Sequence, residues 1–127
     1  MRQFSAASGQ QIPVLRTVGS EPWTHITLPV ILVSVIQSFA DRTTGELWRN
    51  LNSRKLDSRI VRPALRKLRQ LNGAAVLDDL RVPPDNRLEA LHGDRRGQHS
   101  IRVNSQWRIC FTWTPAGPAD IQIVDYH

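Results

Sequence analysis

Three side chains suited to proton transfer stand together at the end of the sequence: Asp125, Tyr126 and His127. A histidine accepts or donates a proton near neutral pH, and Asp125 and the α-carboxylate would both favour its charged form. Tyr126, the only tyrosine, is a second proton-transfer candidate, with the alternative of a ring that caps a sheet. Because terminal residues often fray, the alternative for His127 is a loose end without function.

Other common catalytic arrangements do not occur in the sequence. Cys110 is the single cysteine, and the four histidines are scattered, so neither has the spacing of a metal site. No glycine-rich loop leads into a helix, and no serine lies in a nucleophile elbow. A lone cysteine fits a reducing cytoplasm, and we expect Cys110 to be a small buried hydrophobe. The candidates are therefore histidine, tyrosine and arginine side chains, with no metal and no cofactor.

Basic residues outnumber acidic ones. The 17 Lys and Arg residues against 11 Asp and Glu give a formal net charge of +6. This surplus favours a polyanionic partner, either a nucleic acid or an acidic protein. All the basic residues except Lys55 and Lys67 are arginines, whose planar fork suits phosphate and carboxylate. A genome that prefers arginine codons would produce the same bias, so it selects no partner by itself.

The first 35 residues differ from the rest of the chain. Residues 1–27 show neither helical nor strand periodicity. The apolar run Leu28–Ile36 is too short to span a bilayer and contains a proline, and it lacks the basic start and the small-residue cleavage site of a signal peptide. We interpret it as a strand or as appended chain, and not as a membrane anchor. The sequence therefore predicts an N-terminal extension, residues 1–35, and one folded domain, residues 36–127.

Two helices are expected first in this domain. Asp41 begins a short helical pattern that reaches Leu51. A stronger helix is predicted over residues 59–71, with Asp57 or Ser58 as its N-cap and Asn72-Gly73 as its C-terminal cap. Apolar residues fall on one face at helical spacing: Ile60, Val61, Ala64, Leu65, Leu68 and Leu71. The opposite face carries Arg59, Arg62, Arg66, Lys67 and Arg69.

The second half of the domain has strand periodicity. A short helical turn over residues 74–80 and a loop precede strands at 87–91, 99–103, 107–113 and 120–124, with a loop Pro115–Pro118 before the last. In the third strand Trp107, Ile109, Phe111 and Trp113 point one way, and Arg108, Cys110 and Thr112 the other. Two helices followed by an antiparallel meander predict an α+β domain, with both helices packed on one face of the sheet.

Several segments, in order, together resemble HigB-type toxins of the RelE/ParE superfamily: Ile36–Asp41, Ala64–Leu68, Pro83–Leu91, Gly93–Asn104, Gln106–Phe111 and Val124–His127. The resemblance covers about 92 residues, from Ile36 onward. It implies a microbial RNase fold and metal-independent cleavage of messenger RNA in the ribosomal A site, in the cytoplasm. It also implies a HigA-like helix-turn-helix antitoxin as partner. The toxin would contact DNA only through its complex with this antitoxin.

The resemblance also implies roles for particular residues. RNA cleavage by the neighbouring 2′-hydroxyl needs a base, an acid and cations that stabilise the phosphate. His127, supported by Asp125, is expected to transfer protons, and Tyr126 to transfer a proton or stack on a base. Arg108, in the Trp-Arg-Ile segment, is expected to hold the scissile phosphate; its alternative is a solvated arginine on the sheet.

The remaining candidates are less specific. His92 stands where relatives often carry lysine, and would bind phosphate, relay a proton or simply lie in a turn. Some relatives have a histidine where this chain has Glu89, so a two-histidine mechanism does not carry over. The arginines expected to bind the RNA backbone are Arg95, Arg96, Arg102, Arg66 and Arg69.

Alternatives stay open for the extension and for the function. Family members usually begin with methionine at the position of Val35, so residues 1–34 are expected to be translated upstream sequence; the alternatives are an extra strand or an arm that contacts the antitoxin. A ParE-like toxin that inhibits gyrase and an inactive relative that only binds RNA are the alternatives to a nuclease. The terminal Tyr-His pair and the Trp-Arg-Ile segment favour the nuclease, because a pure binder does not need them.

Overall fold

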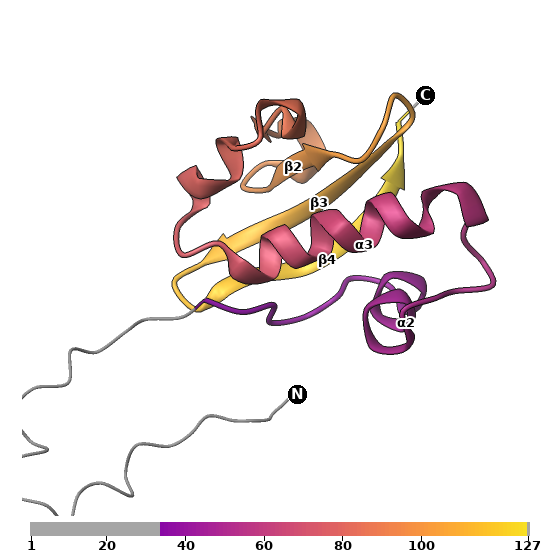
Figure 1. The fold of residues 1–127 in the computed structure, drawn as a ribbon. Helices are drawn as coiled ribbons and strands as arrows, with labels where there is room; N and C mark the ends of the chain where they lie inside the picture. The colour runs from indigo at the N-terminus through magenta and orange to yellow at the C-terminus, as the bar shows by residue number, and fades with distance from the viewer. Residues whose placement is uncertain (1–33, 127) are drawn as a thin grey trace, which may run out of the picture. The chain divides into compact units, whose positions relative to one another are not determined.

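The structure is a computed structural model that describes residues 34–126. The apolar residues 28–33 and the whole of His127 therefore lie outside the described residues. Two helices come first, followed by short 3-10 turns and a four-stranded antiparallel sheet (Figure 1). This is the predicted α+β order. None of the helices within residues 34–126 is long and apolar enough to span a membrane.

Both helices are capped by aspartates: Asp41, as the sequence predicted, and Asp57, one of the two candidates (Asp57 or Ser58) that it offered. In α2 (Arg42–Asn50), the Asp41 carboxylate accepts a hydrogen bond from the Thr44 amide at 3.1 Å. In α3 (Ser58–Gly73), the Asp57 carboxylate accepts from the Arg59 amide at 2.9 Å. A carboxylate at this position satisfies amides of the first turn, which have no acceptor inside the helix. Local chemistry is therefore sufficient to define where each helix begins.

The end of α3 differs from the prediction. The helix continues through Gly73, and Ala74, in an extended conformation, is its C-cap, so the predicted Asn72-Gly73 cap is wrong. The reason is tertiary. The Ala74 carbonyl accepts a hydrogen bond from the Ser34 hydroxyl, and the Asn72 side chain accepts one from the Ile36 amide at 3.0 Å. The chain that precedes the helices thus supplies partners where a left-handed glycine would otherwise end the helix.

Lys67 is buried, although helical spacing placed it with the exposed arginines of α3. Its side chain is 5% exposed, and its Nζ donates to Asn86 Oδ1 at 2.5 Å and lies 3.6 Å from Asp85. Asn86, itself fully buried, donates from Nδ2 to the Leu80 carbonyl at 3.1 Å and to Gln70 Oε1 at 2.9 Å. The 3-10 turns η3 (Leu77–Arg81) and η4 (Pro84–Asn86) thus cover this part of α3. The expectation of an exposed lysine was wrong because periodicity does not show what folds back over a helix.

The sheet has the strand order β1-β2-β3-β4. Its strands are β1 (Glu89–Ala90), β2 (His99–Arg102), β3 (Trp107–Thr114) and β4 (Gly117–Asp125). The strand predicted over 87–91 is only two residues long, because Arg87 follows η4 in the left-handed region, with φ 45°. The last strand begins at Gly117, so the predicted loop Pro115–Pro118 is too long: Gly117 already pairs with Thr114 across the hairpin.

Residues 34–40 run parallel to β4 along its outer edge. The Gln37 amide donates to the Pro118 carbonyl at 2.8 Å, and the Ala40 amide donates to the Ile121 carbonyl at 2.8 Å. At Gly117, where φ is +132°, a Cβ atom would lie 2.1 Å from the Val35 carbonyl oxygen, so only glycine fits. This segment covers an edge that would otherwise leave backbone groups unpaired. Whether residues 1–34 belong to the working protein stays a prediction.

The core lies between the helices and one face of the sheet, as predicted. It joins Leu47 of α2 and the apolar row of α3 to residues of three strands: Ile101, Ile109, Phe111, Ile121 and Ile123. Figure 1 shows α3 lying across the sheet with α2 beside it. The opposite face of the sheet is therefore left to polar side chains and loops.

Candidate functional site

The sheet face opposite the helices collects side chains from three strands. Successive residues of a strand point to opposite faces, so Arg108 and Cys110 of β3 share a face, as predicted. The register places Cys110 between Ser100 of β2 and Gln122 of β4. Tyr126, which follows β4, reaches the same face, where its Oη lies 3.9 Å from Cys110 Sγ. We call these five residues the open face.

Arg108 is held firmly in the open face. The residue is 8% exposed; its Nε donates to Ser100 Oγ at 2.7 Å, and its Nη2 donates to the carbonyls of Arg87 at 2.6 Å and Ser100 at 3.2 Å. Glu89 Oε1 lies 3.9 Å from Nη2. The alternative of a solvated arginine is therefore wrong. Within the described residues Nη1 makes no hydrogen bond, which leaves one nitrogen of a fixed guanidinium for a ligand.

Tyr126 and Cys110 are both biased toward their protonated forms. Burial raises the pKa of the Tyr126 phenol above its usual range, and the neighbouring Cys110 raises it further. Burial likewise raises the pKa of the Cys110 thiol, which is fully buried. At neutral pH the phenol can donate a hydrogen bond or a proton, whereas Cys110 offers no thiolate. The prediction that Cys110 is a small buried hydrophobe is confirmed.

Arg95 brings a second guanidinium to the open face. It ends the short turn η5 (Gly93–Arg95), and its Nη1 donates to Gln98 Oε1 at 3.0 Å and its Nη2 to Gln122 Oε1 at 3.1 Å. The charges of Arg95 and Arg108 both oppose the upward pKa shift of Tyr126, because each guanidinium would attract a phenolate. Two cations therefore act on one hydroxyl, an arrangement that suits an anion such as a phosphodiester.

The sequence comparisons agree with the fold. Residues 37–127 match the family described as the RelE-like toxin of the type II toxin–antitoxin system HigB. The chain belongs to this family. The resemblance that the sequence showed from Ile36 onward is thereby confirmed.

Two curated relatives match shorter stretches of this HigB-family chain. Over 60 residues, 47% of the chain, it is 47% identical to Toxin HigB-1 of Vibrio cholerae, and the match covers 63% of that protein. Over 59 residues, 46% of the chain, it is 36% identical to an uncharacterized protein of Haemophilus influenzae, with 58% of that protein covered. The chain thus matches about three fifths of the length of these relatives.

The other predicted residues of this HigB-family chain do not all gather at the open face. Arg102 does, because it pairs with Arg108 in the register and shares its face. His92 and Arg96 flank η5 and are exposed, and neither side chain makes a hydrogen bond or ion pair within residues 34–126. Asp125 is exposed and accepts from Gln106 Nε2 at 3.1 Å. His127 lies outside the described residues.

Arg66 and Arg69 lie away from the open face. Both are exposed on α3, whose buried side packs against the sheet through Leu68 and its apolar neighbours. The helix and the sheet therefore separate these two arginines from Arg108. One phosphodiester cannot contact both groups, so the predicted RNA-binding arginines divide into two surfaces.

Sequence reasoning missed the residues that orient Arg95 and Arg108. They are Gln98, Gln122, Ser100 and the carbonyl of Arg87. Ser100 lies in the predicted strand 99–103 and Gln98 stands two residues before it, just ahead of that strand, a spacing that was a signal that they share a face. No signal pointed to the Arg87 carbonyl, because its direction depends on a left-handed backbone conformation.

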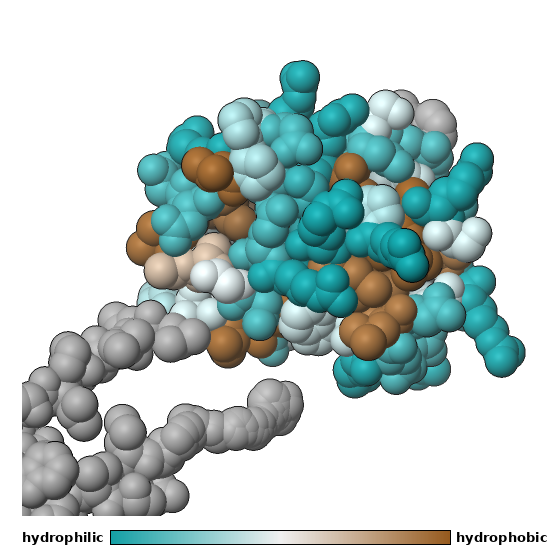
Figure 2. Space-filling model, in the orientation of Figure 1, coloured by the Kyte–Doolittle hydropathy of each residue, from teal (hydrophilic) through white to brown (hydrophobic). Residues whose placement is uncertain are grey.

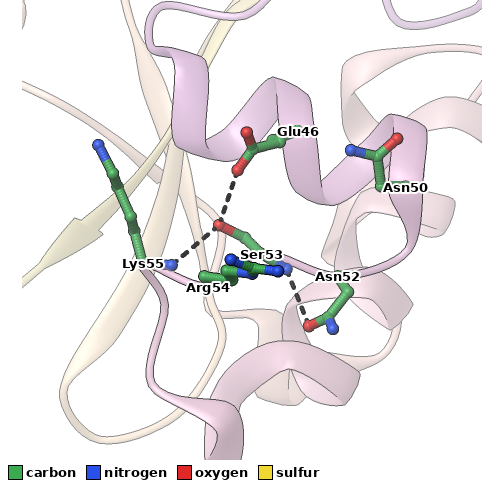
Figure 3. Close-up of a pocket in the computed structure, with 6 residues that line it drawn as sticks. All are labelled: Glu46, Asn50, Asn52, Ser53, Arg54 and Lys55. Carbon is green, nitrogen blue, oxygen red and sulfur yellow. Dashed lines mark hydrogen bonds between the residues drawn. The ribbon is translucent and has the colours of Figure 1, made fainter.

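A polar hollow of about 360 Å³ lies in the chain between α2 and α3 (Figure 3). The Ser53 hydroxyl lies at its centre, donating to Glu46 Oε1 at 3.3 Å and accepting from the Lys55 amide at 3.3 Å. The Ser53 amide donates to Asn52 Oδ1 at 2.9 Å. These groups satisfy one another, and no residue of the open face lines the hollow. We therefore assign no chemistry to it.

Proposed function

We propose that this HigB-family toxin inhibits translation by cutting messenger RNA on the ribosome, without a metal ion. The observation that carries the proposal is the pair of guanidinium groups, Arg95 and Arg108, around the protonated phenol of Tyr126. Fixed cations aimed at a phosphate stabilise the charge that develops on it in the transition state. Tyr126, which is part of this arrangement, immediately precedes His127 in the sequence.

Arg108 is proposed to contact the scissile phosphate through Nη1. Its other nitrogens are occupied by Ser100 and the Arg87 carbonyl, so the guanidinium already has its position before substrate binds. Preorganised donors of this kind avoid the cost of reorientation during the reaction. Arg95, Arg96 and Arg102 are proposed to bind neighbouring phosphates of the RNA backbone.

His127 is proposed to transfer the protons of the reaction, as the family resemblance implies, with Asp125 favouring its charged form. The ribose 2′-oxygen attacks the phosphorus, a base accepts the 2′-hydroxyl proton, and an acid protonates the departing 5′-oxygen. Tyr126 is a proton or hydrogen-bond donor here rather than a base, because its pKa is raised. The exposed His92 remains a second candidate for phosphate binding or proton relay.

The proposed partners follow from the family. The open face has few donors, so we propose that the ribosome holds the messenger RNA in the cleavable conformation and that naked RNA is a poor substrate. A HigA-like helix-turn-helix antitoxin neutralises the toxin in the cytoplasm, and the toxin reaches DNA only through that complex.

Induced expression of the chain in bacterial cells, with transcripts mapped by primer extension, tests this function. We expect growth arrest and cuts inside translated reading frames, with no cuts from an Arg108→Ala variant that is still folded. Intact transcripts together with blocked DNA replication would instead support the ParE-like gyrase inhibitor. Normal growth with RNA binding alone would support an inactive relative.

A further inference from the structure

A buried polar network joins the middle of α3 to the turn that precedes β1. Figure 2 shows hydrophilic side chains along the solvent-facing side of α3, but Lys67 of this helix is buried, with its side chain 5% exposed. Its Nζ donates to Asn86 Oδ1 at 2.5 Å. A lysine is almost never fully buried unless it is paired. The bond to Asn86 is therefore what keeps this ammonium group in the interior.

The side-chain amide of Asn86 is held at both ends. Oδ1 accepts from Lys67, while Nδ2 donates to Gln70 Oε1 at 2.9 Å and to the Leu80 carbonyl at 3.1 Å. Asn86 is fully buried, so turning its amide would leave a buried donor or acceptor unpaired, which is costly. Because these partners belong to α3 and η3, the last residue of η4 is fixed against both.

The next residue, Arg87, has a left-handed backbone, with φ 45° and ψ 57°. A residue other than glycine keeps this conformation only where its surroundings impose it. Asn86 holds the chain on one side, and the Arg87 amide donates to the Pro84 carbonyl at 3.1 Å. On the other side β1 pairs with β2. The imposed conformation directs the Arg87 carbonyl to Nη2 of Arg108, at 2.6 Å.

This carbonyl completes the set of acceptors around Arg108. The other two acceptors both belong to Ser100: its Oγ accepts from Nε at 2.7 Å, and its carbonyl accepts from Nη2 at 3.2 Å. The Arg87 carbonyl supplies the shorter of the two bonds to Nη2. Without it the guanidinium would be held from β2 alone and could tilt. Because the group is planar and rigid, a tilt at Nη2 also moves Nη1.

We propose that Lys67 and Asn86 are positioning residues for Arg108. They impose the left-handed conformation of Arg87, and through its carbonyl they fix the direction of Nη1. Neither residue touches the substrate. The consequence for cleavage rests on the proposed nuclease function, whereas the positioning itself can be measured without RNA. The middle of α3 thus supports a side chain on the opposite face of the sheet.

The first measurement follows the Arg108 guanidinium by heteronuclear NMR of the full chain, without RNA. Its signals are assigned by their loss in Arg108→Lys. In the original chain we expect separate signals for Nη1 and Nη2, because the carbonyls of Arg87 and Ser100 hold Nη2. Lys67→Met keeps a long side chain but removes the donor to Asn86. Rotation of the guanidinium should then accelerate about tenfold, as expected for the loss of one hydrogen bond to a charged group.

Two further variants separate positioning from loss of stability. Ile60→Val shortens a buried side chain elsewhere on α3, so it should lower the melting temperature and leave the Arg108 signals unchanged. Gln70→Ala removes one acceptor of Asn86 and keeps the bonds to Lys67 and Leu80. This milder change should accelerate the rotation less than Lys67→Met does. Unchanged rotation in Lys67→Met, or in Gln70→Ala if Lys67→Met does not fold, would overturn the proposal.

A rescue tests whether the network acts through residue 87. Asparagine adopts the left-handed region more readily than arginine does, so Arg87→Asn should need less support from Lys67. Adding Lys67→Met to Arg87→Asn should therefore accelerate the Arg108 rotation less than adding it to the original chain. Equal accelerations in the two backgrounds would mean that Lys67 does not act through this backbone conformation.

The second measurement is single-turnover cleavage of messenger RNA on purified ribosomes, at a temperature where each variant is folded. At saturating ribosome concentration Lys67→Met should cut about tenfold more slowly, because a displaced donor stabilises the transition state less. The half-saturating concentration should not change, and Ile60→Val should cut at the original rate. Free rotation of Arg108 with an unchanged cleavage rate would overturn the catalytic consequence. An original chain that does not cut at all would contradict the nuclease function, while the NMR result would still decide the positioning role.

Discussion

The open face and the exposed side of α3, which carries Arg62, Arg66 and Arg69, both concentrate arginines, but the two surfaces hold them in different ways. Arg108 is 8% exposed, and three hydrogen bonds fix its guanidinium. The side chains of Arg66 and Arg69 are exposed and make no hydrogen bond or ion pair within the described residues. A guanidinium that is fixed by hydrogen bonds can act on one atom of a bound substrate. An arginine side chain without such bonds takes up one conformation only when a partner binds to it. The net charge of +6 therefore does not distinguish the two kinds of arginine surface that contribute to it.

The position of Arg108 depends on α3 even though the helix lies on the other side of the sheet. Lys67 of α3 holds Asn86 at the end of η4, and the next residue, Arg87, turns its carbonyl toward Arg108 Nη2 at 2.6 Å. The buried lysine therefore belongs to the support of the open face, unlike the exposed arginines of the same helix. This difference between neighbours on α3 can be tested by substitution.

The largest expected effect comes from the chain end. His127→Ala should reduce cleavage of ribosome-bound messenger RNA by about 100- to 10,000-fold, the range for loss of a general acid or base. Cleavage rates on purified ribosome complexes would measure it, with circular dichroism as the check on folding. Arg66→Ala, on the exposed side of α3, is the control and should cleave at the original rate. Equal losses in both variants would remove the functional contrast between the two surfaces.

Arg108→Ala should affect both cleavage and folding. Loss of a preorganised cation typically costs about 100- to 1,000-fold in rate. Three hydrogen bonds, two of them to buried acceptors of Ser100, also disappear, which we expect to cost roughly 2–3 kcal/mol of stability. Urea denaturation and cleavage rates at a temperature where the variant is folded would separate the two effects. A variant with unchanged stability would mean that the hydrogen bonds do not hold Arg108 as described.

Lys67→Met should be destabilising, while Arg66→Met on the same helix should not. Lys67→Met leaves the buried Asn86 oxygen without its donor, which we expect to cost about 1–3 kcal/mol. Exposed substitutions such as Arg66→Met usually change stability by less than about 0.5 kcal/mol. Chemical denaturation of both variants gives the comparison. Similar stabilities would place Lys67 back with the solvated arginines.

The smallest expected effect concerns the start of α3. The side-chain hydrogen bond from Arg59 lowers the pKa of Asp57 from 3.8 to about 2, and the Arg59 amide contributes. The lower folded-state pKa means that the ionised carboxylate stabilises the fold. This contribution is complete above about pH 4 and is lost as the pH falls through about 2. The difference in the free energy of unfolding between the original chain and Asp57→Asn should therefore shrink between pH 4 and pH 2. A difference that does not change with pH would contradict the stabilising role of the ionised Asp57.

Much of the fold could be predicted because local rules decide it. Asp41 and Asp57 begin the helices, since an aspartate at an N-cap bonds the amides of the first turn. The alternation in β3 placed Arg108 and Cys110 on one face and Ile109 and Phe111 in the core. For the candidate site, the sequence indicated Arg95, Arg102, Arg108 and Tyr126, which the structure brings to the same face of the sheet.

Only the tertiary structure decided what surrounds those residues. Lys67 follows the same helical spacing as the arginines beside it, but η3 and η4 fold over that position and bury it. The end of α3 depends on Ser34, 40 residues earlier in the chain. By itself the sequence determined where elements begin and which way side chains alternate, because those properties follow from neighbouring residues. The acceptors that hold Arg108, and the arginines that remain without partners, depend on contacts between distant segments, which local patterns do not encode.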